Sequence, residues 1–177
     1  TESLLGLHRF AWIPFINEAA KPGWVDAMWR AWLETHAEPN GGWPWHPYTV
    51  VERAINILNF SARYGVPGET QQTLNCLYRH AEVIADGLEY WGDHNTSNHL
   101  ANNGRGLCLI GLALELDWAS DLGRQILLRE AGRIFLPSGV LREGSSHYHL
   151  LYVQRYLEVW LAAQSQTRPE ADEFREI

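Results

Sequence analysis

The chain has little positive charge. It holds 21 acidic residues but only 14 Lys and Arg, of which Lys21 is the only lysine, so the formal net charge is −7. An acidic chain is a poor general binder of nucleic acid or of an anionic membrane, and we expect neither as a partner. Arginines in one cleft can still bind an anionic substrate, because a guanidinium grips a carboxylate or sulfate through two hydrogen bonds.

Sulfur ligands and cofactor motifs are also scarce. The two cysteines, Cys76 and Cys108, lie far apart in helix-like segments, which predicts two buried free thiols; the alternative is a disulfide formed in an oxidising compartment. His147 and His149 are two residues apart, a spacing that points them to different helix faces. With no cysteine pair and no glycine-rich phosphate loop, we expect no metal site and no cofactor in this chain.

Long apolar runs and internal repeats are missing too. Without about 18 consecutive apolar residues no transmembrane helix is expected, and without a fixed period a solenoid is disfavoured. The 177 residues suggest a single helical domain, residues 1–177. The sequence shows no signal peptide and does not begin with Met, so we expect a mature form or a piece of a longer protein.

The sequence does contain a series of helical periodicities. Apolar residues recur at steps of three and four, loops rich in Gly and Pro separate these segments, and no segment is a convincing strand. The expected helices span residues 2–19, 23–36, 47–64, 69–87, 96–116, 119–135 and 145–164. Similar lengths and alternating short and longer loops predict an all-α fold of antiparallel helical hairpins that form part of an incomplete α/α toroid. Such a fold binds substrate at one rim.

Two polar patches lie about fifty residues apart, each at the start of a long apolar helix. In the first, Asn98, Asn102 and Arg105 fall on one helix face, and His99 and Asn103 lie beside that stripe. Amide donors with an imidazole and a guanidinium make a suitable cradle for a carboxylate. The alternative is a capped helix start whose remaining polar residues are solvated.

The second patch places Tyr148, Tyr152 and Arg155 on one helix face. A tyrosine beside a cation is usable as a base and then as an acid. The alternative is that both tyrosines are half-buried rings with hydrated hydroxyl groups. The other candidate substrate-binding residues of this patch are Arg142, Glu143, His147 and His149.

Nine tryptophans are many for this length, and we expect most of them in the core. Trp43, Trp45 and Trp91 lie instead in expected loops. A loop tryptophan beside a cleft often stacks on the face of a sugar, and the alternative is a hydrophobic plug. We take Trp45 and Trp91 as candidate substrate contacts.

These patches resemble the heparinase II/III-like polysaccharide lyases, a superfamily that includes heparinases and oligo-alginate lyases. The resemblance is carried by Ser97-Asn98-His99-Leu100 and by the stretch from Gly139 to His149. Residues 7–12, 45–48 and 53–56 also look like the helical domain of that superfamily.

The resemblance implies a helical toroid followed by a C-terminal β-sandwich domain of the same protein, in the bacterial periplasm or secreted. It implies an anionic polysaccharide or oligosaccharide as substrate, cleaved by β-elimination. By the match, Asn98 and His99 neutralise the uronate carboxylate, and Tyr148 is the catalytic acid, base or both. Arg105, Arg142 and Glu143 are then expected to orient these groups.

Two other functions remain open. A glycoside hydrolase on an α/α toroid would use two carboxylic acids, for which Glu143 and Asp93 are the candidates. A non-catalytic carbohydrate-binding module would keep the cleft without turnover. Product analysis separates the three functions.

Overall fold

The computed structural model describes residues 2–15, 22–92 and 98–177, and this part of the chain is all-α. The only β-type pairing there is an isolated bridge between Phe135 and Leu141. The helices are α1 (Glu2–His8), α2 (Pro22–His36), α3 (Pro47–Tyr64), α4 (Thr70–Asp86), α5 (Asn98–Leu114), α6 (Asp117–Ile134), α7 (Ser146–Ser165) and α8 (Glu170–Arg175), with short 3-10 turns η1 (Ile13–Phe15) and η2 (Trp43–Trp45). Chain contacts divide them into two compact units, one ending at Gly87 and the other beginning at Leu88.

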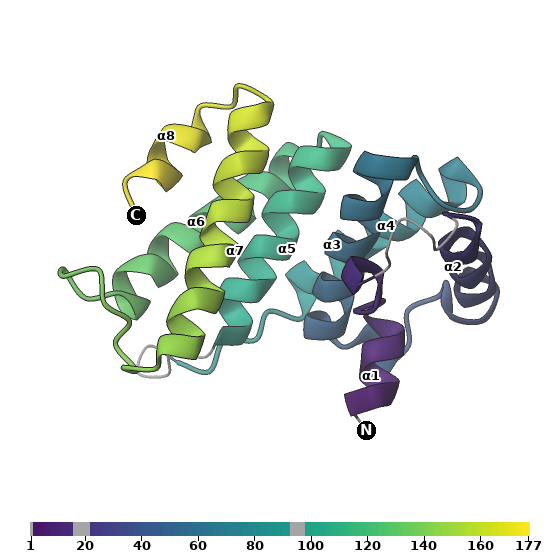
Figure 1. Cartoon of the computed structure of the whole chain (residues 1–177), viewed down its shortest axis with the longest axis horizontal. Helices are drawn as coiled ribbons and strands as arrows, with labels where there is room; N and C mark the ends of the chain where they lie inside the picture. The colour runs from purple at the N-terminus through teal and green to yellow at the C-terminus, as the bar shows by residue number, and fades with distance from the viewer. Residues whose placement is uncertain (1, 16–21, 93–97) are drawn as a thin grey trace. The chain divides into compact units, whose positions relative to one another are not determined.

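The first unit is built around an antiparallel hairpin of α3 and α4 (Figure 1). The end of α4 returns to the start of α3, where a Cβ placed on Gly87 would lie 2.8 Å from Pro47 Cγ. Helix α1 and both 3-10 turns also contact α3. Helix α3 is therefore the central element of this unit.

A buried arginine lies at the centre of the first unit. The Arg53 guanidinium carbon is 4.1 Å from the centre of the Trp32 ring and 5.3 Å from that of Trp45. The guanidinium donates to the Pro44 carbonyl at 2.7 Å and to Nε2 of His80 at 2.8 Å. Burial lowers the pKa of Arg53 to about 9. Aromatic faces and neutral acceptors thus stabilise this cation.

The contact with Arg53 fixes the protonation state of His80. Because Arg53 is a donor, Nε2 of His80 must accept, and the ring proton lies on Nδ1, which donates to the Cys76 carbonyl. Burial, reinforced by the Arg53 charge, lowers the pKa of His80 well below 6.5. His80 is therefore a neutral core residue.

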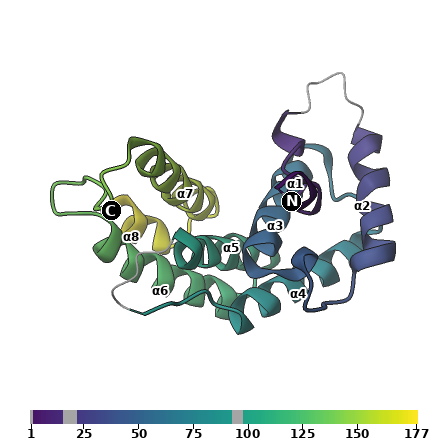
Figure 2. The same ribbon diagram turned by 90° about the horizontal axis from the view of Figure 1, so that it is seen from below.

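In the second unit, α5 and α6 cross with almost no space between their backbones (Figure 2). A Cβ placed on Gly111 would lie 2.3 Å from the Ser120 backbone nitrogen, and one on Gly123 would lie 2.4 Å from that of Cys108. Only a hydrogen atom fits at either glycine. The small residues at this crossing are what allow the two helices to approach so closely.

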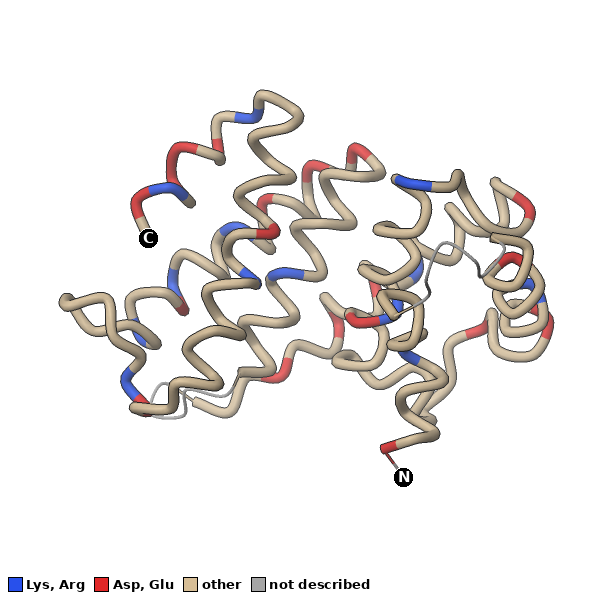
Figure 3. Tube along the Cα trace, in the orientation of Figure 1, with Lys and Arg blue, Asp and Glu red and all other residues tan. Residues whose placement is uncertain are grey.

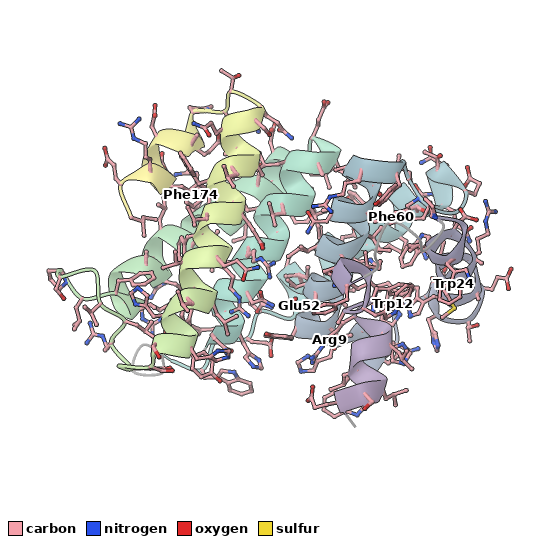
Figure 4. The ribbon with its side chains drawn as sticks, viewed as in Figure 1. Arg9, Trp12, Trp24, Glu52, Phe60 and Phe174 are labelled. Atoms are coloured by element: carbon pink, nitrogen blue, oxygen red, sulfur yellow. The ribbon has the colours of Figure 1, made fainter. Side chains whose placement is uncertain are left out.

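Helices α7 and α8 complete the core of the second unit. Tyr156 of α7 donates its hydroxyl proton to the Leu127 carbonyl of α6 at 2.7 Å. Helix α8 packs on α7 and buries Phe174, which is labelled in Figure 4. Acidic residues dominate the rest of α8, as Figure 3 shows near the C-terminus. Apolar periodicity does not predict this helix, because its six residues are too few to show a repeat.

The expected all-α class is confirmed, and α3 spans the expected residues 47–64. The first expected helix, residues 2–19, is wrong in length, because α1 ends at His8. Phe10 there adopts a left-handed φ of +53°, and the Ala11 backbone N–H donates to the Gly6 carbonyl at 3.1 Å. This geometry closes a helix as glycine usually does. Part of the expected helix falls outside the described residues.

The expectation of two free thiols is confirmed, since Cys76 and Cys108 are unpaired and buried. Burial raises the pKa of each thiol to about 12. Almost no thiolate therefore exists at neutral pH, and both sulfurs serve as small apolar groups.

The helix crossing gives a first prediction. Gly111→Ala should lower the free energy of unfolding by about 1–3 kcal/mol, because the new methyl group overlaps the Ser120 backbone, which cannot rotate away. Gly132→Ala is the matched control: this exposed glycine of α6 has nothing within 4 Å of its Cβ position. That change should stabilise by about 0.5–1 kcal/mol. Urea unfolding of both variants tests the contrast, and equal effects would contradict it.

A second prediction concerns acid stability. Because the pKa of His80 is lower in the folded chain than its ordinary value of 6.5, the unfolded chain binds more protons below pH 6.5. Stability should be complete above that pH and fall as the pH drops, by at most about 1.4 kcal/mol per pH unit from this group. Urea unfolding between pH 8 and 5 measures the slope. His80→Gln should flatten it, whereas exposed His147→Gln should leave it intact.

Candidate functional site

The two polar patches lie at the starts of neighbouring helices in the second unit. Arg105 Nε of α5 donates to Glu158 Oε2 of α7 at 2.8 Å, and Gln166 Nε2 donates to the Leu112 carbonyl at 3.2 Å. Residue numbers rise together along these contacts, so α5 and α7 run parallel. Their first turns therefore lie at the same end of the unit (Figure 1).

The first turn of α5 carries Asn98 and His99, and a buried carboxylate holds the histidine. His99 Nδ1 lies 2.5 Å from Glu89 Oε1. The His99 side chain is 41% exposed, whereas that of Glu89 is only 8% exposed. Asn98 is half-buried. The imidazole is thus held by a buried carboxylate while part of its side chain stays exposed.

Asn103, one helical turn beyond His99, binds the same residue. Its side-chain amide donates to Glu89 Oε2 at 3.2 Å, and its carbonyl accepts from the Glu89 backbone N–H at 2.9 Å. The residue patterns do not point to Glu89, because it lies in the loop after α4, outside both patches. The only available signal was the spacing of His99 and Asn103, four apart on one helix face and able to share a partner.

Asn102 and Arg105 lie in the interior. Arg105 pairs with Glu158 and also donates to Asn102 Oδ1 at 3.2 Å. Both are buried. Burial leaves neither side chain on the surface, and their contact with substrate stays a prediction. The Arg105–Glu158 pair joins α5 to α7. They support the site from inside.

Helix α7 begins with a sharp turn and a capped end. Gly144 has a left-handed φ of +69°, which glycine adopts without strain. Ser145 is the N-cap, and its hydroxyl oxygen accepts from the Tyr148 backbone N–H at 3.3 Å. Tyr148, one turn into the helix, is 38% exposed, and its ring meets that of His147 edge-on at 5.7 Å. The backbone of Tyr148 is fixed by this hydrogen bond and its ring is exposed, so its hydroxyl can reach a ligand.

Tyr152 lies one turn deeper than Tyr148 and is buried. Its hydroxyl has no hydrogen-bond partner among the described residues. Burial raises the pKa of this phenol, because apolar surroundings disfavour the phenolate. Its expected contact with substrate stays a prediction, for a side chain that the fold buries. Arg155 lies over its ring at 5.9 Å and donates to the Asn98 carbonyl at 3.3 Å, which ties α7 to the first turn of α5.

The remaining candidates of the second patch surround the turn before α7. Arg142 Nε donates to the Arg133 carbonyl at 2.9 Å, and His149 Nδ1 accepts from the Leu141 backbone N–H at 3.2 Å. These two residues shape the turn. Glu143 and His147 are exposed and remain candidates for ligand contact.

The two loop tryptophans differ. Trp45 is 3% exposed; its indole N–H donates to the His36 carbonyl at 2.8 Å, and Arg53 and His80 lie against its ring. Trp45 is therefore a core residue of this structure, and its contact with a sugar stays a prediction. Trp91 is 69% exposed and keeps that candidacy.

Within residues 2–15, 22–92 and 98–177, no group of three His, Cys, Asp or Glu side chains could hold a metal ion. No helix in those ranges is long and apolar enough to cross a membrane. Asp93, the second carboxylate of the hydrolase alternative, lies outside the described residues.

The described surface offers a defined set of chemical groups. An oriented imidazole and an asparagine start α5, and a half-exposed phenol starts α7. The positive end of the α5 dipole lies at the same place and favours a negative ligand group. These groups suit a reaction in which a carboxylate is bound and a proton moves.

Comparison of the chain with protein-family models, with curated proteins and with solved structures finds no match.

The Arg105–Glu158 pair gives a third prediction. Glu158→Gln should lower the free energy of unfolding by about 1–3 kcal/mol, because the buried guanidinium loses its charged acceptor. Thermal and urea unfolding would measure the loss. The control is Glu176→Gln, an exposed carboxylate of the same unit. A Glu158 variant as stable as this control would show that the pair contributes nothing to the α5–α7 contact.

Proposed function

We propose that the chain is the helical domain of a polysaccharide lyase that cleaves uronate-containing glycans by β-elimination. The observation that carries the proposal is the parallel pairing of α5 and α7, because it brings the starts of both polar patches to one end of the second unit. Two residue motifs that resemble the heparinase II/III-like lyases thereby become neighbours. The resemblance calls for such an arrangement, because it assigns both motifs to one reaction.

The proposed reaction begins at C5 of the uronate, next to its carboxylate. The C5–H bond is too weakly acidic to break unless the charge that spreads onto the carboxylate is stabilised. Asn98 and His99 would donate hydrogen bonds to that carboxylate, and the dipole of α5 would add to their effect. Substrate binding would thus also lower the barrier to proton removal.

Tyr148 would carry the proton. The electrons of the broken C5–H bond form the C4–C5 double bond, the C4–O4 bond breaks, and O4 leaves with a proton. A phenol poised on one side of the sugar could take the C5 proton, give one to O4, or do both. Tyr148 is the exposed tyrosine of the α7 start, whereas Tyr152 is buried.

The proposal extends to architecture and setting. The helical pairs α3–α4 and α5–α6 are the hairpins from which an α/α toroid would be built. A C-terminal β-sandwich domain would supply the opposite wall of the cleft, and the protein would act in the periplasm or outside the cell. The substrate would be an anionic polysaccharide or oligosaccharide, with no cofactor in this chain.

Mutation of the tyrosine tests the reaction. Mixing the natural-length protein with a panel of uronate polymers should raise ultraviolet absorbance, since elimination leaves a double bond conjugated to the carboxylate. Tyr148→Phe should lower kcat by about 100-fold or more. Tyr64→Phe, which removes the hydroxyl of an exposed tyrosine in the first unit, is the control and should keep the wild-type rate.

The other outcomes would point to another function or remove Tyr148 from the reaction. Products without the new absorbance band would mean hydrolysis. Glycan binding without product would indicate a binding module. A Tyr148→Phe variant with an unchanged rate would remove Tyr148 from the reaction while leaving the lyase activity standing.

A further inference from the structure

The Glu89 carboxylate makes more bonds than anchoring its loop requires. Asn103 already ties Glu89 to α5 through two hydrogen bonds, one to the backbone N–H and one to Oε2. The second carboxylate oxygen is directed at His99 Nδ1, 2.5 Å away. This additional bond holds an imidazole whose side chain is 41% exposed. It constrains a residue that the fold itself does not bury.

We propose that Glu89 is a positioning residue for His99: it keeps a proton on Nδ1, so that Nε2 is the ring nitrogen that meets the substrate. The proposal rests on the proposed function above. A carboxylate accepts only, so the ring nitrogen facing it must be the donor. A solvated histidine would instead exchange its proton between both nitrogens and rotate.

The orientation decides what His99 can do to a uronate. With Nδ1–H committed to Glu89, a ring that carries one proton presents Nε2 as an acceptor. A ring that carries two protons presents Nε2–H as a donor to the substrate carboxylate. In both states the same nitrogen faces the ligand. Fixing that nitrogen before the substrate binds removes an ordering cost from the reaction.

Nitrogen NMR of the 15N-labelled chain tests the tautomer directly. The His99 signals, identified by their loss in His99→Gln, should show that Nδ1 carries a proton. Glu89→Ala should convert them to the averaged signals of a free ring, and Glu89→Gln keeps the side-chain volume if the alanine variant unfolds. Asp172→Asn, an exposed carboxylate of α8, is the matched control and should leave the signals unchanged.

Kinetics then test the positioning role. On a glycan that the natural-length protein cleaves, Glu89→Ala should lower kcat about tenfold or more while KM changes less than about threefold. A wild-type ring protonated on Nε2 alone would overturn the proposal whatever the enzyme does. An unchanged kcat in the Glu89 variant would also overturn it. If no uronate glycan is cleaved, the lyase function fails, whereas an Nδ1-protonated ring lost in Glu89→Ala would still support the hold of Glu89 on His99.

Discussion

Helices α5 and α6 approach so closely that Gly111 and Gly123 have room for nothing larger than hydrogen, and the second unit is built on this contact. With one side of α5 pressed against α6 and another against α7, its first three turns lose most of their water. The polar side chains of those turns must then find partners inside the protein. Arg105 forms an ion pair with Glu158, and the Asn103 side chain donates a hydrogen bond to Glu89. Close packing thus dictates the hydrogen bonding of the unit.

The same hydrogen bonds define the candidate site. The Arg105 pair sets α7 alongside α5, and Arg155 ties α7 to the carbonyl of Asn98. The hydrogen bonds of Asn103 hold the Glu89 carboxylate next to His99. Few of these groups face solvent, yet each determines where an exposed one lies. Substitutions that weaken the core of this unit would therefore also disturb the site.

Apolar periodicity predicts most of the helices, because a buried stripe is written directly in the residue order. It fails at ends that depend on backbone conformation. Phe10 and Glu115 both take the left-handed conformation in which glycine usually ends a helix, and neither residue type signals it. Spacing also predicts that Asn98 and Asn102 lie on one helix face, and that Tyr148 and Tyr152 lie on another. It could not predict which of them is buried, because burial depends on neighbouring helices. Hence spacing reveals neither the burial of Asn102 and Tyr152 nor the contact of Glu89 with His99.

The two units hold buried charge in opposite ways, and the difference explains where a site could arise. Arg53 in the first unit is enclosed by aromatic rings, a carbonyl and a neutral histidine. The groups that stabilise its charge therefore lie inside the unit. Glu89 in the second unit is bound by Asn103 and by a histidine that reaches solvent. A buried charge whose partner is itself buried acts only within the fold. A buried charge whose partner is exposed also orients that partner for whatever arrives from solution, and Glu89 with His99 is such a pair.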